Sequence, residues 1–193
     1  MASARHAHPR FPAWLSFVLT GRRRRREYPP EAIAERLGIR PGDTVMDFGC
    51  GPGFFTGAFA AKAQRVVAVD AQPAMLEKAR KRLGPAAARV EFVSTDDGTV
   101  VGVPSDSVDL VFLSFVFHEL PNPEGVVREL ARTMRQGGRL AIMERTEPAR
   151  NPFNPPRVDP AWVEQHVVRA GLTARERIRW ARASLLVFEK TAA

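Results

Sequence analysis

The stretch "VMDFGCGPGFFT", residues 45–56, decides the fold of this chain. An apolar strand pattern gives way to three glycines at alternate positions, Gly49, Gly51 and Gly53, and apolar residues then return at helical spacing. A strand that turns through glycines into a helix commonly cradles a phosphate. Here an acidic residue, Asp47, stands just before the first glycine, and its charge favours a cationic ligand instead.

Strand and helix patterns alternate on both sides of this stretch. Largely apolar runs, such as "VDLVFL" at 108–113, predict strands buried on both faces, as in a parallel sheet covered by helices. The last two predicted strands are separated by only three residues and are therefore expected to pair antiparallel. The predicted strands are residues 44–48, 65–69, 90–93, 108–113, 139–143, 174–180 and 184–190, and the predicted helices are residues 30–38, 54–63, 73–83, 124–134 and 160–170.

The 193 residues suffice for one sizeable domain, which we place at residues 29–193. Residues 1–28 are expected to form a basic, irregular N-terminal arm, because the five consecutive arginines at 22–26 repel one another. The net charge of +8 raises the question of a nucleic-acid partner. Arginine outnumbers lysine 25 to 4, however, a bias that GC-rich codons also produce, so a nucleic-acid partner is not favoured.

The composition also bears on the compartment and on metals. No apolar run reaches the roughly 20 residues of a transmembrane helix, and no secretory signal is expected, since the arginines follow the apolar residues 11–19 instead of preceding them. We expect a cytoplasmic protein. A single cysteine, Cys50, allows no intramolecular disulfide and no cysteine-based metal cluster, and we expect no metal site. No sequence feature specifies an oligomeric state.

Acidic residues also follow the second and third predicted strands. Asp70 comes 19 residues after Gly51 and is placed to accept both hydroxyls of a ribose. Asp96 and Asp97 follow the third strand and are placed to reach an adenine amino group. The carboxyl ends of parallel strands share one edge of a sheet, so a single ligand explains all these acids. S-adenosylmethionine carries an ammonium and a sulfonium and no phosphate, and it is the predicted cofactor.

Five motifs together resemble the class I S-adenosylmethionine-dependent methyltransferase family over residues 29–190. They are "DFGCGPG", "VVAVDAQPAMLEKAR", "VEFVSTDD", "SVDLVFLSFVFHELPNPEGVVRELARTMRQGGRLAIME" and "LLVFEK". The fourth motif resembles the branch that contains the ubiquinone and menaquinone biosynthesis methyltransferases. The resemblance implies a Rossmann-like α/β fold: a seven-stranded, mostly parallel sheet with its last strand antiparallel and helices on both faces.

The resemblance also implies the cofactor-binding residues, with S-adenosylhomocysteine as the product. They are Asp47, Gly49, Cys50, Gly51 and Gly53 at the methionine end, Ser114 and Phe115 near the sulfonium, Asp70 at the ribose, and Ala71, Met75, Asp96 and Asp97 at the adenine. The family often has Gly-Asp-Ala where this chain has Thr95-Asp96-Asp97, so both aspartates stay candidates for the adenine. Tyr28 is placed to close over the cofactor.

Methyl transfer is an in-line displacement that releases a neutral thioether, so alignment and desolvation supply much of the rate. A general base is needed only where the nucleophile must lose a proton. His118 and Glu144 follow the fourth and fifth predicted strands and are the candidate catalytic residues. The alternatives are that His118 packs the following loop and that Glu144 forms a salt bridge.

The favoured function is methyl transfer from S-adenosylmethionine to a small molecule, and apolar residues suggest a hydrophobic acceptor. These residues are Trp14, Phe55, Phe115, Phe117 and Phe153. One alternative is an RNA methyltransferase that uses the arginine-rich arm, for which affinity would fall steeply with salt. Another is a non-catalytic S-adenosylmethionine-binding module.

Overall fold

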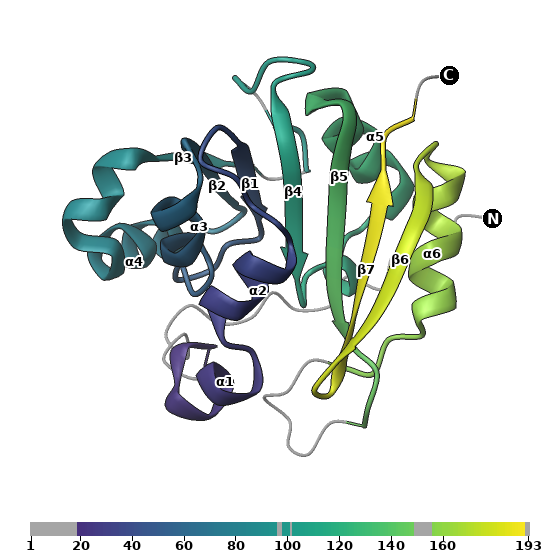
Figure 1. Cartoon of the computed structure of the whole chain (residues 1–193), viewed down its shortest axis with the longest axis horizontal. Coiled ribbons are helices and arrows are strands. Elements are labelled where there is room, and N and C mark those ends of the chain that lie inside the picture. Colours follow the sequence, from purple (N-terminus) through teal and green to yellow (C-terminus); the bar gives the residue numbers. More distant parts are fainter. Residues whose placement is uncertain (1–18, 96–97, 101, 149–155, 192–193) are drawn as a thin grey trace.

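A seven-stranded sheet with the order β3-β2-β1-β4-β5-β7-β6 runs through the molecule (Figure 1). The computed structural model describes residues 19–95, 98–100, 102–148 and 156–191. The strands are β1 (Thr44–Phe48), β2 (Arg65–Asp70), β3 (Val90–Ser94), β4 (Val108–Ser114), β5 (Met134–Arg145), β6 (Thr173–Trp180) and β7 (Ala183–Glu189). The first five strands pair in parallel, and β7 is antiparallel to both β5 and β6. The predicted α/β fold class is confirmed.

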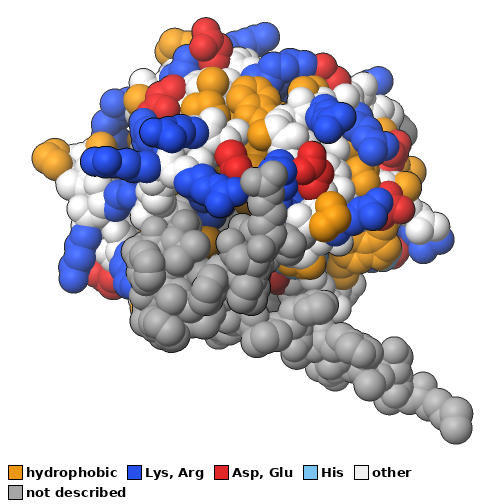
Figure 2. Space-filling view, turned by 90° about the horizontal axis from the view of Figure 1, so that it is seen from below, with side chains coloured by type: hydrophobic (Ala, Val, Ile, Leu, Met, Phe, Trp, Pro, Cys, Tyr) orange, Lys and Arg blue, Asp and Glu red, His pale blue; other side chains and the backbone are white. Residues whose placement is uncertain are grey.

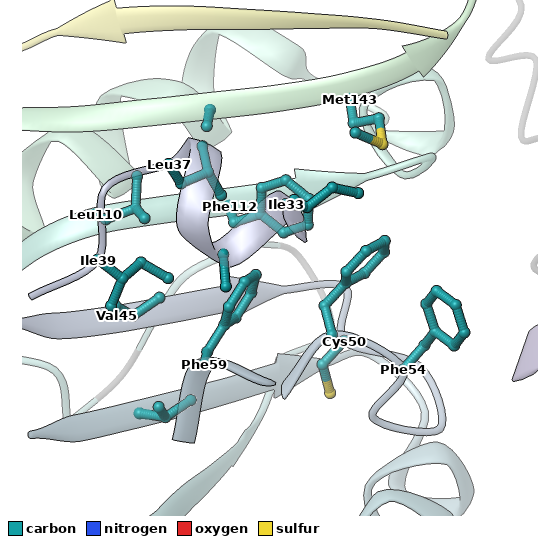
Figure 3. Packing of buried hydrophobic residues seen from close by; sticks show 14 of the residues in the cluster. Ile33, Leu37, Ile39, Val45, Cys50, Phe54, Phe59, Leu110, Phe112 and Met143 are labelled. Atoms are coloured by element: carbon teal, nitrogen blue, oxygen red, sulfur yellow. The ribbon is translucent and has the colours of Figure 1, made fainter. Parts of the chain in front are cut away.

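Helices cover both faces of the sheet. They are α1 (Arg22–Glu27), α2 (Pro30–Arg36), α3 (Thr56–Lys62), α4 (Pro73–Leu83), α5 (Pro123–Thr133) and α6 (Pro160–Arg169), with short 3₁₀ turns at Gly84–Arg89 and Phe117–Glu119. Successive β1 residues point to opposite faces: Val45 joins a core cluster with α2 and α3, and Met46 joins a second cluster with α5 and α6. Figure 3 shows the first cluster, in which Phe59 of α3 packs edge-on against Phe112 of β4.

Local sequence sets where the helices begin. Proline occupies the first position of four of them, where its missing N–H costs nothing. The Asn122 side chain accepts a hydrogen bond from the Gly125 N–H of α5, and Asp159 accepts one from the Ala161 N–H of α6. No helix in the described part of the chain is long and apolar enough to cross a bilayer.

The fifth strand is longer than the sequence indicates. The predicted strand covers residues 139–143, whereas β5 begins at Met134 and includes Gly137 and Gly138. The Gly137 N–H donates to the Lys190 carbonyl, and the Lys190 N–H donates to Gly138, so pairing with the end of the chain extends the strand. A Cβ at residue 138 would lie 2.7 Å from the Arg135 carbonyl oxygen, which explains why glycine is needed there.

The expectation of an irregular arm was wrong for Arg22–Glu27, which form α1. Ion pairs of Arg23 with Glu27 and of Arg25 with Glu31 offset the repulsion among the arginines. Trp180 Nε1 donates to the Glu27 carbonyl at 3.2 Å, and Tyr28 is buried in the core, so tertiary contacts hold the helix in place. Residues 1–18 lie outside the described residues, and a division of the chain at residue 28 stays a prediction.

Candidate active site

The site lies where the strand order reverses, between β1 and β4. In an open α/β sheet the loops that leave such neighbouring strands diverge, and the crevice between them binds ligands. The residues after β1, β2, β4 and β5 all lie at this edge. Figure 1 shows α1 at the end of the molecule where the arrows of β4 and β5 finish.

The glycine loop is held tightly against its neighbours. The N–H groups of Gly49 and Cys50 both donate to the Val69 carbonyl, at 2.8 and 2.9 Å. Gly49, Gly51 and Gly53 all adopt positive φ, at 72°, 53° and 75°. A Cβ at Gly49 would lie 2.5 Å from Val116, whereas a Cβ at Gly51 would meet open space. The first glycine is therefore required by packing, and the second leaves room above the loop.

Asp47 is a buried carboxylate with a shifted pKa. It is 2% exposed, and its Oδ2 accepts a 2.6 Å hydrogen bond from the Thr56 hydroxyl. Burial raises the pKa of Asp47 to about 7; the Thr56 hydrogen bond and the charge of Arg24 oppose this rise, and the charge of Asp70 adds to it. A ligand ammonium at this position would supply the positive charge that the carboxylate needs.

Asp70, at the end of β2, ties two loops together. Its Oδ2 accepts from the Gly51 N–H at 2.8 Å, and its Oδ1 accepts from the Gln72 N–H at 2.9 Å. An ionised carboxylate has about four acceptor positions, so these contacts are compatible with added ribose hydroxyls. Ala71 is partly exposed beside it, and Met75 of α4 is almost fully buried.

The predicted adenine acids, Asp96 and Asp97, lie outside the described residues. Thr95 directly before them is buried and organises the turn. Its hydroxyl donates to the Thr99 carbonyl and accepts from the Gly98 N–H. The role of either aspartate stays a prediction.

Strain and unpaired polar atoms mark the end of β4. Phe115 is a non-glycine residue with φ of 59°, a left-handed conformation that costs energy and occurs often at functional sites. Its ring contacts Tyr28 edge-on, with the centroids 5.1 Å apart. In the described part of the chain, the buried side-chain atoms without a hydrogen-bond partner are Arg24 Nε, Tyr28 Oη and Ser114 Oγ.

These three atoms belong to residues that contact Phe115 or precede it. Buried polar atoms in proteins are nearly always paired, so an unpaired group of them indicates a place completed by a ligand. Together with the buried Asp47, they fit a ligand that has both cationic and polar groups. The residues present therefore fit S-adenosylmethionine at this edge.

His118 and Glu144 meet beside the same edge. His118 Nδ1 lies 3.0 and 3.1 Å from the two carboxylate oxygens of Glu144, which is 2% exposed in β5. Burial works to lower the pKa of His118, but the hydrogen bond and charge of Glu144, helped by Glu119, outweigh it and raise the pKa. A carboxylate at Nδ1 favours the tautomer whose other nitrogen, Nε2, can accept a proton.

Some expected residues take other places. Phe55 packs against Phe59 and Phe112 in the core, and Phe117 is buried against Trp162, so a place for Phe55 and Phe117 beside the pocket stays a prediction. Cys50 is buried in the glycine loop, and burial, with the charges of Asp47 and Asp70, raises the pKa of its thiol. Trp14 and Phe153 lie outside the described residues.

Sequence reasoning missed three residues that shape the site. Arg24 is the α1 arginine that turns inward, but its sequence neighbours are identical to it. Thr56 binds Asp47 from nine residues away, and Val116 fills the space left by Gly49. No local pattern distinguishes these residues, because their roles arise from contacts between different segments.

Comparison with known proteins agrees with this geometry. A family model described as "Methyltransferase domain" matches residues 46–142, half of the chain. The chain belongs to the S-adenosylmethionine-dependent methyltransferases. It superposes with a TM-score of 0.83 on a S-adenosylmethionine-dependent methyltransferase from Aquifex aeolicus, at 25% identity and over 93% of this chain and 98% of the other. The family uses S-adenosylmethionine as its methyl donor.

Curated relatives match about 60% of the chain. A demethylmenaquinone methyltransferase of Clavibacter sepedonicus is 37% identical over 118 residues, which are 60% of this chain and 47% of the relative. A trans-aconitate 2-methyltransferase of Azoarcus is 37% identical over 112 residues, which are 57% of this chain and 42% of the relative. The methyltransferase chain thus spans about half the length of the curated relatives it matches.

Alanine substitutions at Gly49 and Gly51 should lower the free energy of unfolding by different amounts. Gly49→Ala places a Cβ against Val116 in a left-handed backbone, and we expect a loss of about 2–4 kcal/mol in the free energy of unfolding. Gly51→Ala adds only the backbone strain, about 1–2 kcal/mol, and its Cβ occupies the open side. Chemical denaturation measures both values. Equal losses in the two variants would contradict the assigned packing of Gly49.

Proton linkage at Asp47 should make cofactor binding pH-dependent. With a pKa of about 7, Asp47 is protonated at low pH, so we expect affinity for S-adenosylmethionine to fall about tenfold per pH unit below 7. Because this folded-state pKa exceeds the ordinary value of 3.8, the contribution of Asp47 to the stability of the ligand-free protein is lost as pH rises from about 4 to about 7.

Calorimetric titrations between pH 5.5 and 8.5 measure the affinity, with the Asp47→Asn variant as the control. The variant should bind more weakly at pH 8 and lose the pH dependence that Asp47 causes. An unchanged pH profile in Asp47→Asn would mean that another group carries the linkage.

Proposed function

We propose that this protein transfers a methyl group from S-adenosylmethionine to a small, largely apolar molecule whose nucleophilic atom gives up a proton to His118. The observation that carries this proposal is the His118–Glu144 pair beside the cofactor edge. A partly buried histidine held by a fully buried carboxylate is the arrangement of a general base.

Each group at the edge has a task in this reaction. Bound S-adenosylmethionine supplies an electrophilic methyl group on a sulfonium whose leaving group is a neutral thioether. Asp47 would bind the ammonium, and Asp70 would bind the ribose, which together fix the direction of the methyl. Phe115 and Tyr28 would exclude water from the reacting atoms. Alignment and desolvation of this kind account for much of the rate in such a displacement.

The His118–Glu144 pair would handle the proton. Glu144 holds Nδ1, so Nε2 is the atom that takes the proton from the acceptor. Glu144 also stabilises the imidazolium that forms, which keeps the base effective in a partly buried site. The proton then leaves His118 to water after the methylated product departs.

The nature of the acceptor is inferred from the site walls. Tyr28 contacts Phe115, and Arg24 lies over the rings of both Phe54 and Phe115, so the three aromatic residues lie close together at the edge. Such walls favour a planar or apolar molecule. Methyltransferase relatives named for demethylmenaquinone and trans-aconitate support a small metabolite as the acceptor.

The catalytic proposal predicts a pH–rate profile. S-adenosylhomocysteine formation is followed with a panel of small hydroxylated aromatic compounds, with total RNA as the comparison acceptor. Activity should rise with pH as the imidazolium of His118 loses its proton, with the midpoint above the usual histidine value. His118→Gln should lower kcat roughly 100-fold without changing cofactor affinity.

Glu144→Gln should move the midpoint of the profile to lower pH, because the variant removes the charge that raises the pKa of His118. His166→Gln is the matched control, since His166 lies on α6 and bonds to the Trp162 carbonyl. Full activity in His118→Gln would contradict the general-base role, and transfer only to RNA would contradict the small-molecule acceptor.

A further inference from the structure

Arg24 differs from the other arginines of α1. Arg22, Arg23, Arg25 and Arg26 are exposed, whereas Arg24 is turned inward and half-buried. Figure 2 views this end of the molecule and shows Lys and Arg side chains spread over its described surface. An arginine that is buried among other arginines loses hydration and gains no favourable charge interaction from them.

The surroundings of Arg24 join three parts of the site. Its guanidinium carbon lies 4.9 Å from the centroid of the Phe54 ring in the glycine loop and 5.2 Å from that of Phe115 after β4. Contact with aromatic faces compensates part of the lost hydration. The charge of Arg24 also acts on Asp47, as the opposing effects on their two pKa values show.

The charge of Arg24 is incompletely satisfied. Its Nε is buried without a hydrogen-bond partner, and Arg24 forms no ion pair with any residue in the described part of the chain. Burial lowers the pKa of Arg24 to about 10, which shows that Tyr28 and Asp47 do not fully compensate the desolvated cation. A buried guanidinium with a free donor is a binding site for a planar anion, of which a carboxylate is the best match.

We propose that Arg24 binds the carboxylate of the methionine end of S-adenosylmethionine, while Asp47 binds the ammonium of the same amino acid. The inference rests on the proposed use of S-adenosylmethionine at this edge. An α-amino acid end carries one positive and one negative group on a single carbon. Arg24 lies over Phe54 of the glycine loop and Asp47 directly precedes that loop, so the two residues present complementary charges at the same loop.

This assignment gives α1 a role in recognition. The helix is fixed by the Trp180–Glu27 hydrogen bond and by burial of Tyr28, and these contacts hold Arg24 over the loop. Arg24 is then a specificity-determining residue, because it distinguishes ligands that carry the carboxylate from adenosine derivatives that lack it. The positive charge of Arg24 also opposes the rise in the pKa of Asp47 that burial causes in the ligand-free protein.

The test removes the carboxylate from the ligand and the guanidinium from the protein. Binding of S-adenosylmethionine and of decarboxylated S-adenosylmethionine is measured by calorimetry on the wild type, Arg24→Gln and Arg26→Gln. Arg26→Gln is the matched control, because it removes the same charge from an exposed position of the same helix. Thermal denaturation of all three proteins reports whether each variant is folded.

We expect Arg24→Gln to weaken S-adenosylmethionine binding roughly 10- to 100-fold and to change the affinity for the decarboxylated ligand less than threefold. Arg26→Gln should leave both affinities close to those of the wild type. An equal loss for both ligands, or no loss for either, would overturn the inference.

Failure of the wild type to bind S-adenosylmethionine at all would instead overturn the proposed function. Arg24→Lys provides a second reading should Arg24→Gln not fold. It keeps the charge and loses the planar fork, and we expect it to retain only part of the preference for the carboxylated ligand. A full preference in Arg24→Lys would show that a point charge suffices and that bidentate contact plays no part.

Discussion

Two buried carboxylates at neighbouring strand ends are the constraint on which the site depends. Asp47 and Asp70 lie on β1 and β2, paired in parallel, so the sheet itself brings the two acids together. Each charge raises the cost of ionising the other, and burial adds to that cost, as the pKa of Asp47 shows. The two carboxylates also hold neighbouring segments in place, which offsets part of this cost. Asp70 accepts a hydrogen bond from the Gly51 N–H, and Asp47 accepts one from the Thr56 hydroxyl. A ligand with positive charge would offset the repulsion between the two carboxylates.

The other side of the edge is apolar and cationic. Phe115, in a strained left-handed conformation, supports Tyr28 and Arg24 above the glycine loop. The site thus combines acids at the ends of β1 and β2 with an arginine and aromatic rings, and the His118–Glu144 pair follows β4 and ends β5. This arrangement suits a methyl donor that binds through its charged groups and a methyl acceptor that binds against the aromatic rings of the protein.

Much of this could be predicted from the sequence, since the decisive signals are local. The run 108–113 is apolar except for Asp109 and predicts a buried strand, and the position of Asp47 before the glycines indicated a cationic ligand. Longer-range effects could not be predicted. The length of β5 depends on pairing with Lys190, at the end of the chain, and the helix at Arg22–Glu27 depends on Trp180, more than 150 residues away. Arg24 is indistinguishable from its neighbours until the fold turns it inward.

The most direct test of the account is a calorimetric titration of S-adenosylmethionine and S-adenosylhomocysteine into the wild-type protein and into Asp70→Asn. Asparagine keeps the size of the side chain and one acceptor oxygen for the loop N–H groups. It removes the negative charge and the second oxygen that would accept hydrogen bonds from the ribose hydroxyls. The account predicts that the wild type binds both ligands and that the folded variant binds them at least tenfold more weakly. Unchanged affinity in Asp70→Asn, or no binding to the folded wild type, would contradict the placement of the cofactor at this edge.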